Sequence, residues 1–369
     1  MSSGWNPARG LLLLALGASP GWAEFPVPEA PFAPRSYECR WTDTAPRVDG
    51  RPDEPCWAAA PWTEDFVDIR GGDWPAPPLR ARARLLWDAT HLFVAAELQE
   101  PDLWATYDRH DMVVYHEHDF ELFLDPDGDN HHYYELEINA LGTVWDLLLT
   151  APYRDDGCAV DSWEIPGLQS AVSLDGTLNN PSDRDQGWTV ELALPWAVLE
   201  ETARRPAPPR PGDAWRLNFS RVEWHLDVVD GAYHKRVDPV TSTPLPEENW
   251  VWSPQGLVAM HYPERWGLLR FQGPAAADAG ESPEWTLDEL TAGEALMQVY
   301  YAQRRELEEH GICSDAPVGR GLTPAPGWTP VVLRSAGVRF TAHTQRADGL
   351  LLEVDERGRL SRRKLETRP

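Results

Sequence analysis

The 369-residue chain has few cysteines, few basic residues and no long apolar segment beyond its first residues. Its four cysteines include no C-x-x-C motif and match no zinc-binding spacing, which argues against a structural zinc site. Lysine and arginine total 33 against 59 acids, giving a formal net charge of −26. This balance repels phosphate backbones and anionic lipid, so nucleic acid and membrane surfaces are not expected partners. No later segment is long enough for membrane insertion.

The pairing of the cysteines stays open at the level of sequence. In an oxidising compartment, four cysteines permit three pairings. Cys39 and Cys56 are the favoured pair because both lie in the same N-terminal region. Unpaired buried thiols are the alternative.

The first 23 residues have the pattern of a secretory signal peptide. Arg9 supplies a basic start, residues 11–16 an apolar core, and Gly21, Trp22 and Ala23 a small-x-small cleavage site. The pattern predicts cleavage near Ala23 and a secreted or periplasmic protein. A disordered apolar start on a cytosolic protein is the other interpretation.

Turn-forming residues are abundant, since 35 prolines and 27 glycines favour short strands over helices. The 42% of hydrophobic residues and the 19 tryptophans are enough for a sizeable core. About eight or nine strands without regular intervening helices predict an all-β fold, an antiparallel sandwich or jelly roll. The clearest strands are expected at 79–87, 91–98, 168–174, 188–194, 214–224 and 266–271.

A second, smaller part is expected after residue 272. Residues 273–284 have the composition of a linker, rich in alanine, proline and glycine. Residues 287–310 carry apolar side chains at helical spacing, and three short apolar stretches follow them. The pattern predicts a small C-terminal α+β appendage over 285–369, either for packing or for docking a partner.

The most informative segment is 119–149, which reads as three alternating strands joined by two turns. Its simplest register sets Glu121 opposite Glu137, and Glu137 opposite Asp146, with Trp145 on the apolar core face. Because like charges directly opposite one another destabilise a sheet, this row of acids calls for a partner. An arginine, a metal ion or a polyol ligand would serve. A solvated outer face is the alternative.

Six ordered motifs resemble those of one protein family. They are V-D-G-R-P-D-E-P-C-W at 48–57, L-L-W-D-A-T-H-L-F-V-A-A-E-L at 85–98, H-D-F-E-L-F-L-D-P-D-G-D at 118–129, Y-Y-E-L-E-I-N at 133–139, G-W-T-V-E-L-A-L-P-W at 187–196 and P-E-R-W-G-L-L-R-F at 263–271. Together, over residues 37–272, the chain resembles the family 9 carbohydrate-binding module and its wider group. The resemblance implies an immunoglobulin-like or jelly-roll β-sandwich, non-catalytic binding of plant-wall oligo- or polysaccharides, and an association with secreted polysaccharide degradation.

The resemblance also implies where a sugar would bind. Members of the family clamp a sugar ring between two tryptophans, and the first clamp position falls at Tyr115, followed by an acid at Glu121. The second clamp position falls near Met260, which is not aromatic, and a sugar-contacting arginine position falls on Glu137, which reverses the charge. Tyr115 still offers a flat apolar face with a polar tip.

Further candidates for the site come from the residues around this segment. Asn139 and Asp146 are expected to add hydrogen bonds to sugar hydroxyls. Trp104 follows a strand and is expected either to bind a ligand or to cap the end of the sandwich. Trp163 lies in the long loop 150–187 and would replace the missing second clamp ring.

A turn with three aspartates is the candidate metal site. Asp125, Asp127 and Asp129 suggest calcium, although the glycine of an EF-hand loop stands at the wrong place and helical flanks are lacking. A tight acidic hairpin turn is the alternative interpretation. His116 and His118, which share a strand face, are a second candidate for metal binding.

Two other function classes remain open. Glu121 and Glu137 would act as acid and base if the protein were a glycoside hydrolase. A haem-binding, cytochrome-like sandwich would need Met112, Met260 or Met297 as an axial ligand, and Soret absorption would reveal it. Beyond the predicted signal peptide, where Ser19 stands in G-A-S-P-G, the sequence contains no G-x-S-x-G nucleophile motif. The favoured interpretation is a secreted, non-catalytic saccharide-binding β-sandwich.

Overall fold

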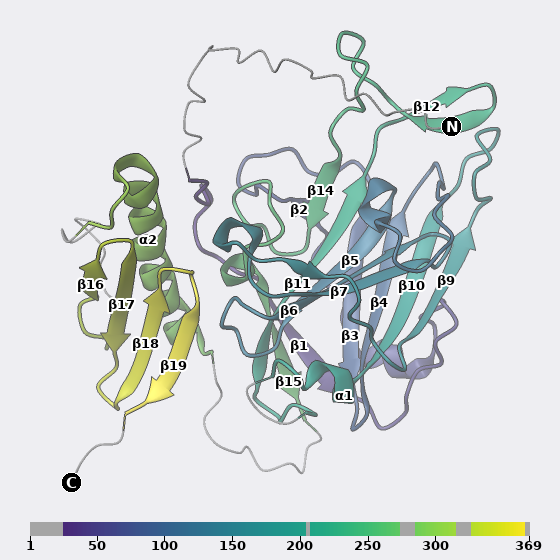
Figure 1. The fold of residues 1–369 in the computed structure, drawn as a ribbon. Coiled ribbons are helices and arrows are strands. Elements are labelled where there is room, and N and C mark those ends of the chain that lie inside the picture. The colour runs from purple at the N-terminus through teal and green to yellow at the C-terminus, as the bar shows by residue number, and fades with distance from the viewer. Residues whose placement is uncertain (1–24, 204–206, 274–284, 315–325, 366–369) are drawn as a thin grey trace, which may run out of the picture.

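The computed structural model describes residues 25–203, 207–273, 285–314 and 326–365. They form a large β-sandwich and a smaller module of one long helix on a sheet (Figure 1). The predicted signal peptide (1–23) and residues 274–284 of the predicted linker lie outside the described residues. Within the described residues, no helix is long and apolar enough to cross a bilayer.

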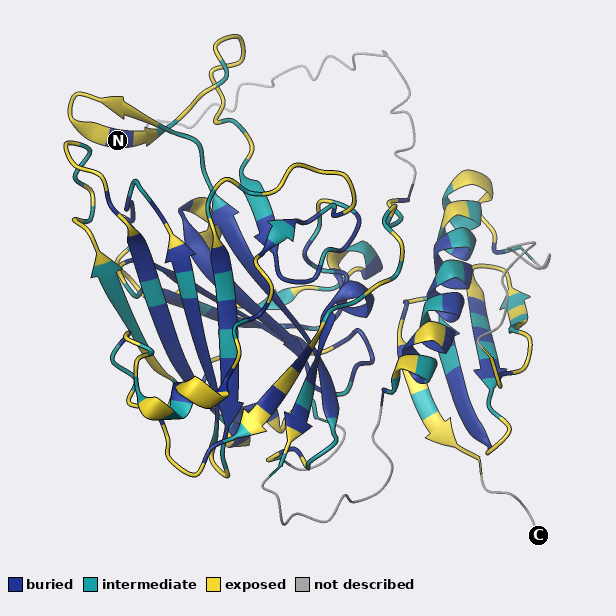
Figure 2. Ribbon diagram, turned by 180° about the vertical axis from the view of Figure 1, so that it is seen from behind, coloured by how far each residue is buried: buried dark blue, intermediate teal, exposed yellow. Residues whose placement is uncertain are grey.

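Thirteen strands form one large sheet. They are β1 (Ser36–Trp41), β2 (Val67–Asp68), β3 (Ala81–Trp87), β4 (His91–Gln99), β5 (Asp119–Asp125), β6 (Tyr133–Asn139), β7 (Val144–Leu149), β8 (Ala159–Val160), β9 (Gln169–Asp175), β10 (Gly187–Pro195), β11 (Ala214–Glu223), β14 (Glu248–Val251) and β15 (Gly267–Gln272). Their order is β8-β7-β6-β5-β11-β15-β1-β3-β4-β10-β9, and β14 pairs with both β11 and β2. The sheet curls so that its two halves face each other, as the crossing strands in Figure 2 show.

Strand β1 joins the two halves and is an exception to the predicted antiparallel pairing. It runs parallel to β15 on one side and to β3 on the other. A parallel neighbour requires a long crossover, and residues 42–80 provide one between β1 and β3. The other pairs between these strands are antiparallel, as predicted, and the β-sandwich class is confirmed.

The main core lies between the two halves and is rich in aromatic rings. Trp87, Trp196, Trp215 and Phe271 pack edge to face, with ring centroids 5.2 to 6.2 Å apart. Edge-to-face packing is the favoured geometry because the positive edge of one ring meets the negative face of the next. This interior, visible as the buried strands of Figure 2, makes the sandwich a rigid support for its outer face.

The favoured Cys39–Cys56 disulfide is not formed, and all four cysteines are free. Cys39, on β1, is fully buried in the main core. Cys56, in the short helix η1 (Pro55–Ala59), packs against a separate cluster that contains Leu86 and Phe93. The two thiols therefore lie on opposite faces of the β3–β4 layer, which proximity in sequence could not reveal.

Short elements connect the strands. They are η2 (Val114–His116), η3 (Tyr153–Asp155), α1 (Trp196–Leu199), η4 (Pro263–Arg265) and a separate hairpin of β12 (Leu226–Val229) and β13 (Ala232–Lys235). Three of these connections, η2, η3 and the segment before η4, come together over the outer face of β5, β6 and β7.

The C-terminal module has the predicted helix, α2 (Leu287–His310), packed on a four-stranded antiparallel sheet of β16 (Val332–Ala336), β17 (Arg339–Gln345), β18 (Leu350–Asp355) and β19 (Leu360–Lys364). A capping box starts the helix: Thr286 accepts from the backbone of Glu289, whose side chain accepts from the backbone of Thr286. Gly311 ends it with φ at 71°. Strand β19 was not predicted.

The module packs against the sandwich of its own chain. Asp155 accepts hydrogen bonds from Tyr300 and Arg304 of α2, and Arg359 forms an ion pair with Asp129 at 2.7 Å. Trp285, which is 1% exposed, donates its indole N–H to the carbonyl oxygen of Asp127. The appendage thus has a docking surface within the same molecule.

Candidate functional site

A cleft of about 280 Å³ opens on the outer face of β5, β6 and β7. Strand alternation puts every second side chain of β5 and β6 on this face, while Phe120, Leu122 and their neighbours face the main core. Acids form the floor of the cleft and aromatic rings stand beside them. The residues that line the cleft include Tyr115, Glu121, Glu135, Glu137, Trp145 and Tyr153.

Four buried carboxyl groups, those of Asp119, Glu121, Glu135 and Glu137, lie together on β5 and β6. Glu121 is directly opposite Glu137, as the sequence predicted. The four are only 0%, 4%, 6% and 1% exposed, respectively, so the interpretation as a solvated outer face is wrong. The segment that carries Met260 packs over this face and forms part of the cleft wall.

Burial and mutual repulsion hold these carboxyl groups towards their protonated forms. Burial first, and then Glu121, raises the pKa of Asp119 and of Glu135 well above its usual range. The same causes, with Asp119 and Glu135 added, raise the pKa of Glu137 well above its usual range. Burial, reinforced by Glu247, raises the pKa of Glu121 to about 7. Ionising these carboxyl groups without a nearby cation therefore costs folding free energy.

Hydrogen bonds satisfy only part of this floor. One oxygen of Asp119 accepts from the backbone N–H of Val222 at 3.1 Å, while Oδ2 is buried without a partner. Oε2 of Glu121 is also buried without a partner. Oε2 of Glu137 accepts from the backbone N–H of Tyr115 at 2.8 Å. Glu137 therefore positions the first predicted clamp residue.

Strand β7 is shifted by one residue from its predicted register. Trp145 lies opposite Glu137, and Asp146 lies opposite Leu136. The predicted Glu137–Asp146 pair and the assignment of Trp145 to the main core are therefore wrong. Strand β7 has large apolar residues on both faces, so its alternation alone did not identify the side that faces the core.

The corrected register brings a second aromatic ring to the cleft. Tyr115 and Trp145 stack with ring centroids 6.1 Å apart and planes 29° apart. Tyr115 is 37% exposed, so its ring remains accessible. Tyr153, which is 51% exposed, also lines the cleft and contacts the ring of His261. Sequence reasoning missed Trp145 and Tyr153 as site residues, and only the pairing of β7 could have revealed Trp145.

Two predicted hydrogen-bonding residues face other partners. Asn139 donates to the carbonyl oxygen of Tyr107 and accepts from the backbone N–H groups of Leu141 and Thr143. Asp146 lies on the opposite side of β7 from Trp145 and accepts from the backbone N–H of Ile165 at 2.7 Å. Neither lines the cleft.

The two predicted tryptophans also lie outside it. Trp104 is 9% exposed and packs edge to face on His118, with centroids 5.4 Å apart. Trp163 stacks on Tyr134, whose side chain belongs to the main core, and donates to Glu201. Met260, at the second clamp position, does line the cleft.

The aspartate turn has the hydrogen bonds of an acidic hairpin. Asp125 accepts from the backbone N–H groups of Gly128 and Asn130, and Asp127 accepts from that of Asp129. Asp129 itself is paired with Arg359 of the C-terminal module. Ligand oxygens of the three aspartates lie within 4.8 Å of one another, so calcium at this turn stays a prediction.

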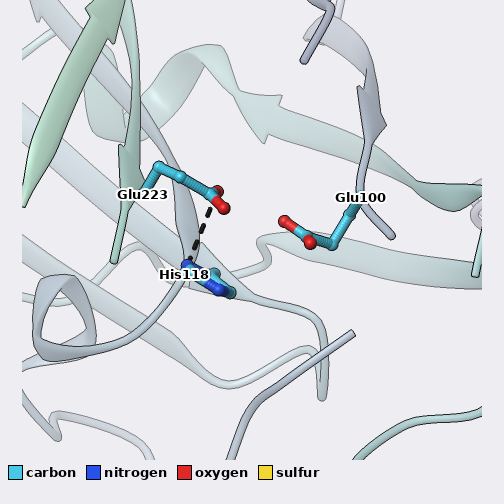
Figure 3. Close-up of side chains that lie close together, drawn as sticks. All are labelled: Glu100, His118 and Glu223. Atoms are coloured by element: carbon cyan, nitrogen blue, oxygen red, sulfur yellow. Dashed lines mark ion pairs between the residues drawn. The ribbon is translucent and has the colours of Figure 1, made fainter. Parts of the chain in front are cut away.

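A second buried acidic group lies beside the floor and has its own cation. Glu100, His118 and Glu223 converge, and a dashed line in Figure 3 marks the 3.5 Å contact between His118 and Glu223. The guanidinium of Arg221 pairs with Glu100 at 2.6 Å and with Glu223 at 2.8 Å. Burial lowers the pKa of His118 to about 4, so this ring is neutral at pH 7. Arg221 thus supplies the counter-charge of this group, while Nε2 of His118 is buried without a hydrogen-bond partner.

Together, the fold and the cleft define a β-sandwich protein with an aromatic-walled acidic binding site. Residues 48–210 match the model of the family described as carbohydrate family 9 binding domain-like. The predicted family is thus confirmed for this region, which contains β3 to β10 and most of the cleft floor. No functionally curated protein matches the chain.

Several solved structures are similar to the chain, among them three at low identity. A family 9 carbohydrate-binding module from Caldicellulosiruptor kristjanssonii, in complex with cellotriose, is 15% identical, with a TM-score of 0.41 over 66% of this chain and 96% of that chain. A second structure, of a family 9 carbohydrate-binding module from the same organism in complex with glucose, is 15% identical, with a TM-score of 0.41 over 67% of this chain and 100% of that chain. A candidate carbohydrate-binding protein from Bacteroides uniformis is 17% identical, with a TM-score of 0.48 over 65% and 100% of the two chains.

Proposed function

We propose that the cleft binds a saccharide without cleaving it, and that the protein is exported. The observation that carries the proposal is the stacked pair Tyr115 and Trp145 beside buried carboxylates within the region that matches the family. An aromatic ring offers a flat apolar surface for the C–H face of a pyranose, while carboxylates accept hydrogen bonds from its hydroxyls.

The dimensions of the cleft favour a short ligand or the end of a chain. Its volume of about 280 Å³ lies at the lower limit of ordinary ligand sites, roughly 300 Å³. Glu247 and Asn249, on the side formed by β14 and the loop before it, add polar groups at the rim. The exposed ring of Tyr153 is placed to contact a second sugar unit.

The arrangement of the acids supports binding rather than hydrolysis. A glycoside hydrolase needs its acid and its nucleophile or base on different sides of the scissile bond. Glu121 and Glu137 instead lie side by side on neighbouring strands and share the floor with Asp119 and Glu135. The three that line the cleft, Glu121, Glu135 and Glu137, face a bound sugar from the same side.

Export is supported by the signal-peptide pattern in residues 1–23. Expression of the full chain with intact-mass measurement tests it. Recovery from the medium or periplasm with cleavage near Ala23 is expected. Cytoplasmic retention of the uncleaved chain would contradict export.

The binding proposal is tested by calorimetry with xylo-, cello- and manno-oligosaccharides, with and without calcium. We expect at least one series to bind. Trp145→Ala should weaken binding at least tenfold, about 1.4 kcal/mol, because one face of the sugar loses its stacking partner. Trp74→Ala is the matched control, since Trp74 is 51% exposed and lies outside the cleft. No binding in any series, or equal affinity of Trp145→Ala, would overturn the proposal.

A further inference from the structure

We propose that Asp119, Glu121 and Glu137 bind a calcium ion on the floor of the cleft. One oxygen of each carboxylate lies within 4.8 Å of the other two. This spacing allows all three oxygens to contact one ion at the 2.3 to 2.6 Å typical of calcium, roughly, after small side-chain adjustments. The site is distinct from the turn at Asp125, Asp127 and Asp129.

Unpartnered oxygens provide independent support for a ligand here. Asp119 and Glu121 are 0% and 4% exposed, and each has one buried carboxylate oxygen without a hydrogen-bond donor. A buried acceptor without a donor is costly, and a buried carboxylate without a counter-charge is more so. A cation in contact with both oxygens would remove both costs.

The basic side chain of Arg221 does not provide that charge. Arg221 is close enough to lower the pKa of Asp119 slightly against the larger effects of burial and Glu121. Its guanidinium, however, is ion-paired with Glu100 and Glu223, both of which compete for it. Within the part of the chain that the structure describes, the network of Glu100, His118 and Glu223 (Figure 3) is paired with Arg221, whereas no basic side chain forms an ion pair with the floor.

The donor set identifies the class of ion. All three donors are carboxylate oxygens, which favour hard cations over zinc or copper. Glu135, the fourth acid, is two residues from Glu137 on the same face of β6 and adds negative charge. Magnesium demands a near-ideal octahedron, whereas calcium accepts an irregular set of six to eight oxygens. Calcium therefore suits carboxylates on two neighbouring strands better than magnesium does. Water on the cleft side would complete its coordination.

The calcium site does not depend on saccharide binding, although the two would be neighbours. Glu121 and Glu137 line the cleft, so coordination positions facing the opening are accessible to water. If the proposed function holds, a pair of sugar hydroxyls replaces that water. The ion would then take the place of the arginine that the family resemblance led us to expect at position 137.

The test is a titration of the chelator-treated full chain with calcium alone, and with terbium as a luminescent substitute. Trp145 lies opposite Glu137 and is placed to sensitise terbium emission. We expect an ion-binding step whose affinity falls at least about tenfold in both Glu137→Gln and Asp119→Asn. Glu200→Gln, at an exposed glutamate outside the cleft, is the matched control and should retain the wild-type affinity.

Thermal melting in chelator shows whether these variants are folded. Each amide removes one buried charge from a repelling group, so Glu137→Gln should melt at or above the wild-type temperature. The rise in melting temperature that calcium gives the wild type should be absent from that variant. The proposal is overturned by no binding at millimolar calcium, by binding that both floor variants retain, or by a Glu137→Gln chain that melts lower in chelator. Saccharide is not needed in any arm, so failure of the proposed function leaves this result unaffected.

Discussion

At the scale of single residues, one histidine beside the cleft has a strongly lowered pKa. His261 lies at the edge of the cleft, where its ring contacts Tyr153 and its Nδ1 is hydrogen-bonded to Tyr133 at 3.0 Å. Burial, and to a smaller extent the positive charge of Arg154, lowers the pKa of His261 to about 3. The ring therefore stays neutral in the folded protein between about pH 6.5 and pH 3, the range in which a histidine of the unfolded chain becomes protonated.

This depressed pKa predicts a definite pH dependence of stability. Between about pH 6.5 and pH 3 the unfolded state binds a proton that the folded state does not, so stability falls as the pH falls. The contribution approaches about 1.4 kcal/mol per pH unit. Chemical denaturation of the wild type and of His261→Gln across this range measures it. An equal pH dependence in the two proteins would contradict the account.

The acids of the floor predict a pH dependence of stability opposite to that of His261. Burial raises the pKa of Glu135 well above its usual range. Its carboxyl group therefore lowers the free energy of unfolding increasingly as the pH rises above about 4.3, the pKa of a glutamate in the unfolded chain. In chelator, Glu135→Gln should therefore raise the melting temperature more at about pH 8 than at about pH 5. Glu200→Gln, at an exposed glutamate outside the cleft, serves as the control. A larger gain in melting temperature at about pH 5 than at about pH 8 would contradict this prediction.

At the scale of elements, strand alternation predicted which acids share a face, but it did not predict the whole site. The β5–β6 register followed from residues such as Leu122 and Leu136, which are paired and face the core. Strand β7 has Leu147, Leu148 and Leu149 in succession, so either face can be read as the apolar one. The position of Trp145 therefore required the observed pairing.

Other parts of the fold show what else sequence can and cannot provide. Helix α2 was predicted over 287–310 from the helical spacing of its apolar side chains, and the structure adds a capping box at its start. The hairpin of β3 and β4 was evident from its Asp88 turn and alternation. The burial of the floor, in contrast, depends on the segment around Met260, more than 100 residues away in sequence from both β5 and β6, for which local patterns contain no signal.

At the scale of the whole molecule, the sandwich and the C-terminal module share buried side chains. Trp285 belongs to a core cluster that also contains Phe25, Tyr262 and Leu268 of the larger part. Burying an aromatic side chain of this size across a boundary favours unfolding of the two parts together. The module therefore acts as a structural extension of the sandwich.

The predicted consequence is that a change at this boundary destabilises the entire chain. Trp285→Ala should lower the free energy of unfolding by about 3–5 kcal/mol, because it leaves a cavity and removes the hydrogen bond to Asp127. Trp74→Ala, on an exposed tryptophan, should change it by at most about 0.5 kcal/mol. Denaturant unfolding followed by fluorescence and circular dichroism measures both. An unfolding transition of the module alone would contradict a shared core.

The most direct test of the central claim is a crystal structure of the full chain grown with calcium and the best-binding oligosaccharide. The account predicts a sugar ring on the face of Tyr115 and Trp145, with its hydroxyls directed to the floor, and an ion in contact with Glu121 and Glu137. A sugar bound elsewhere, for example beside Trp74, with no ligand in the cleft, would contradict it.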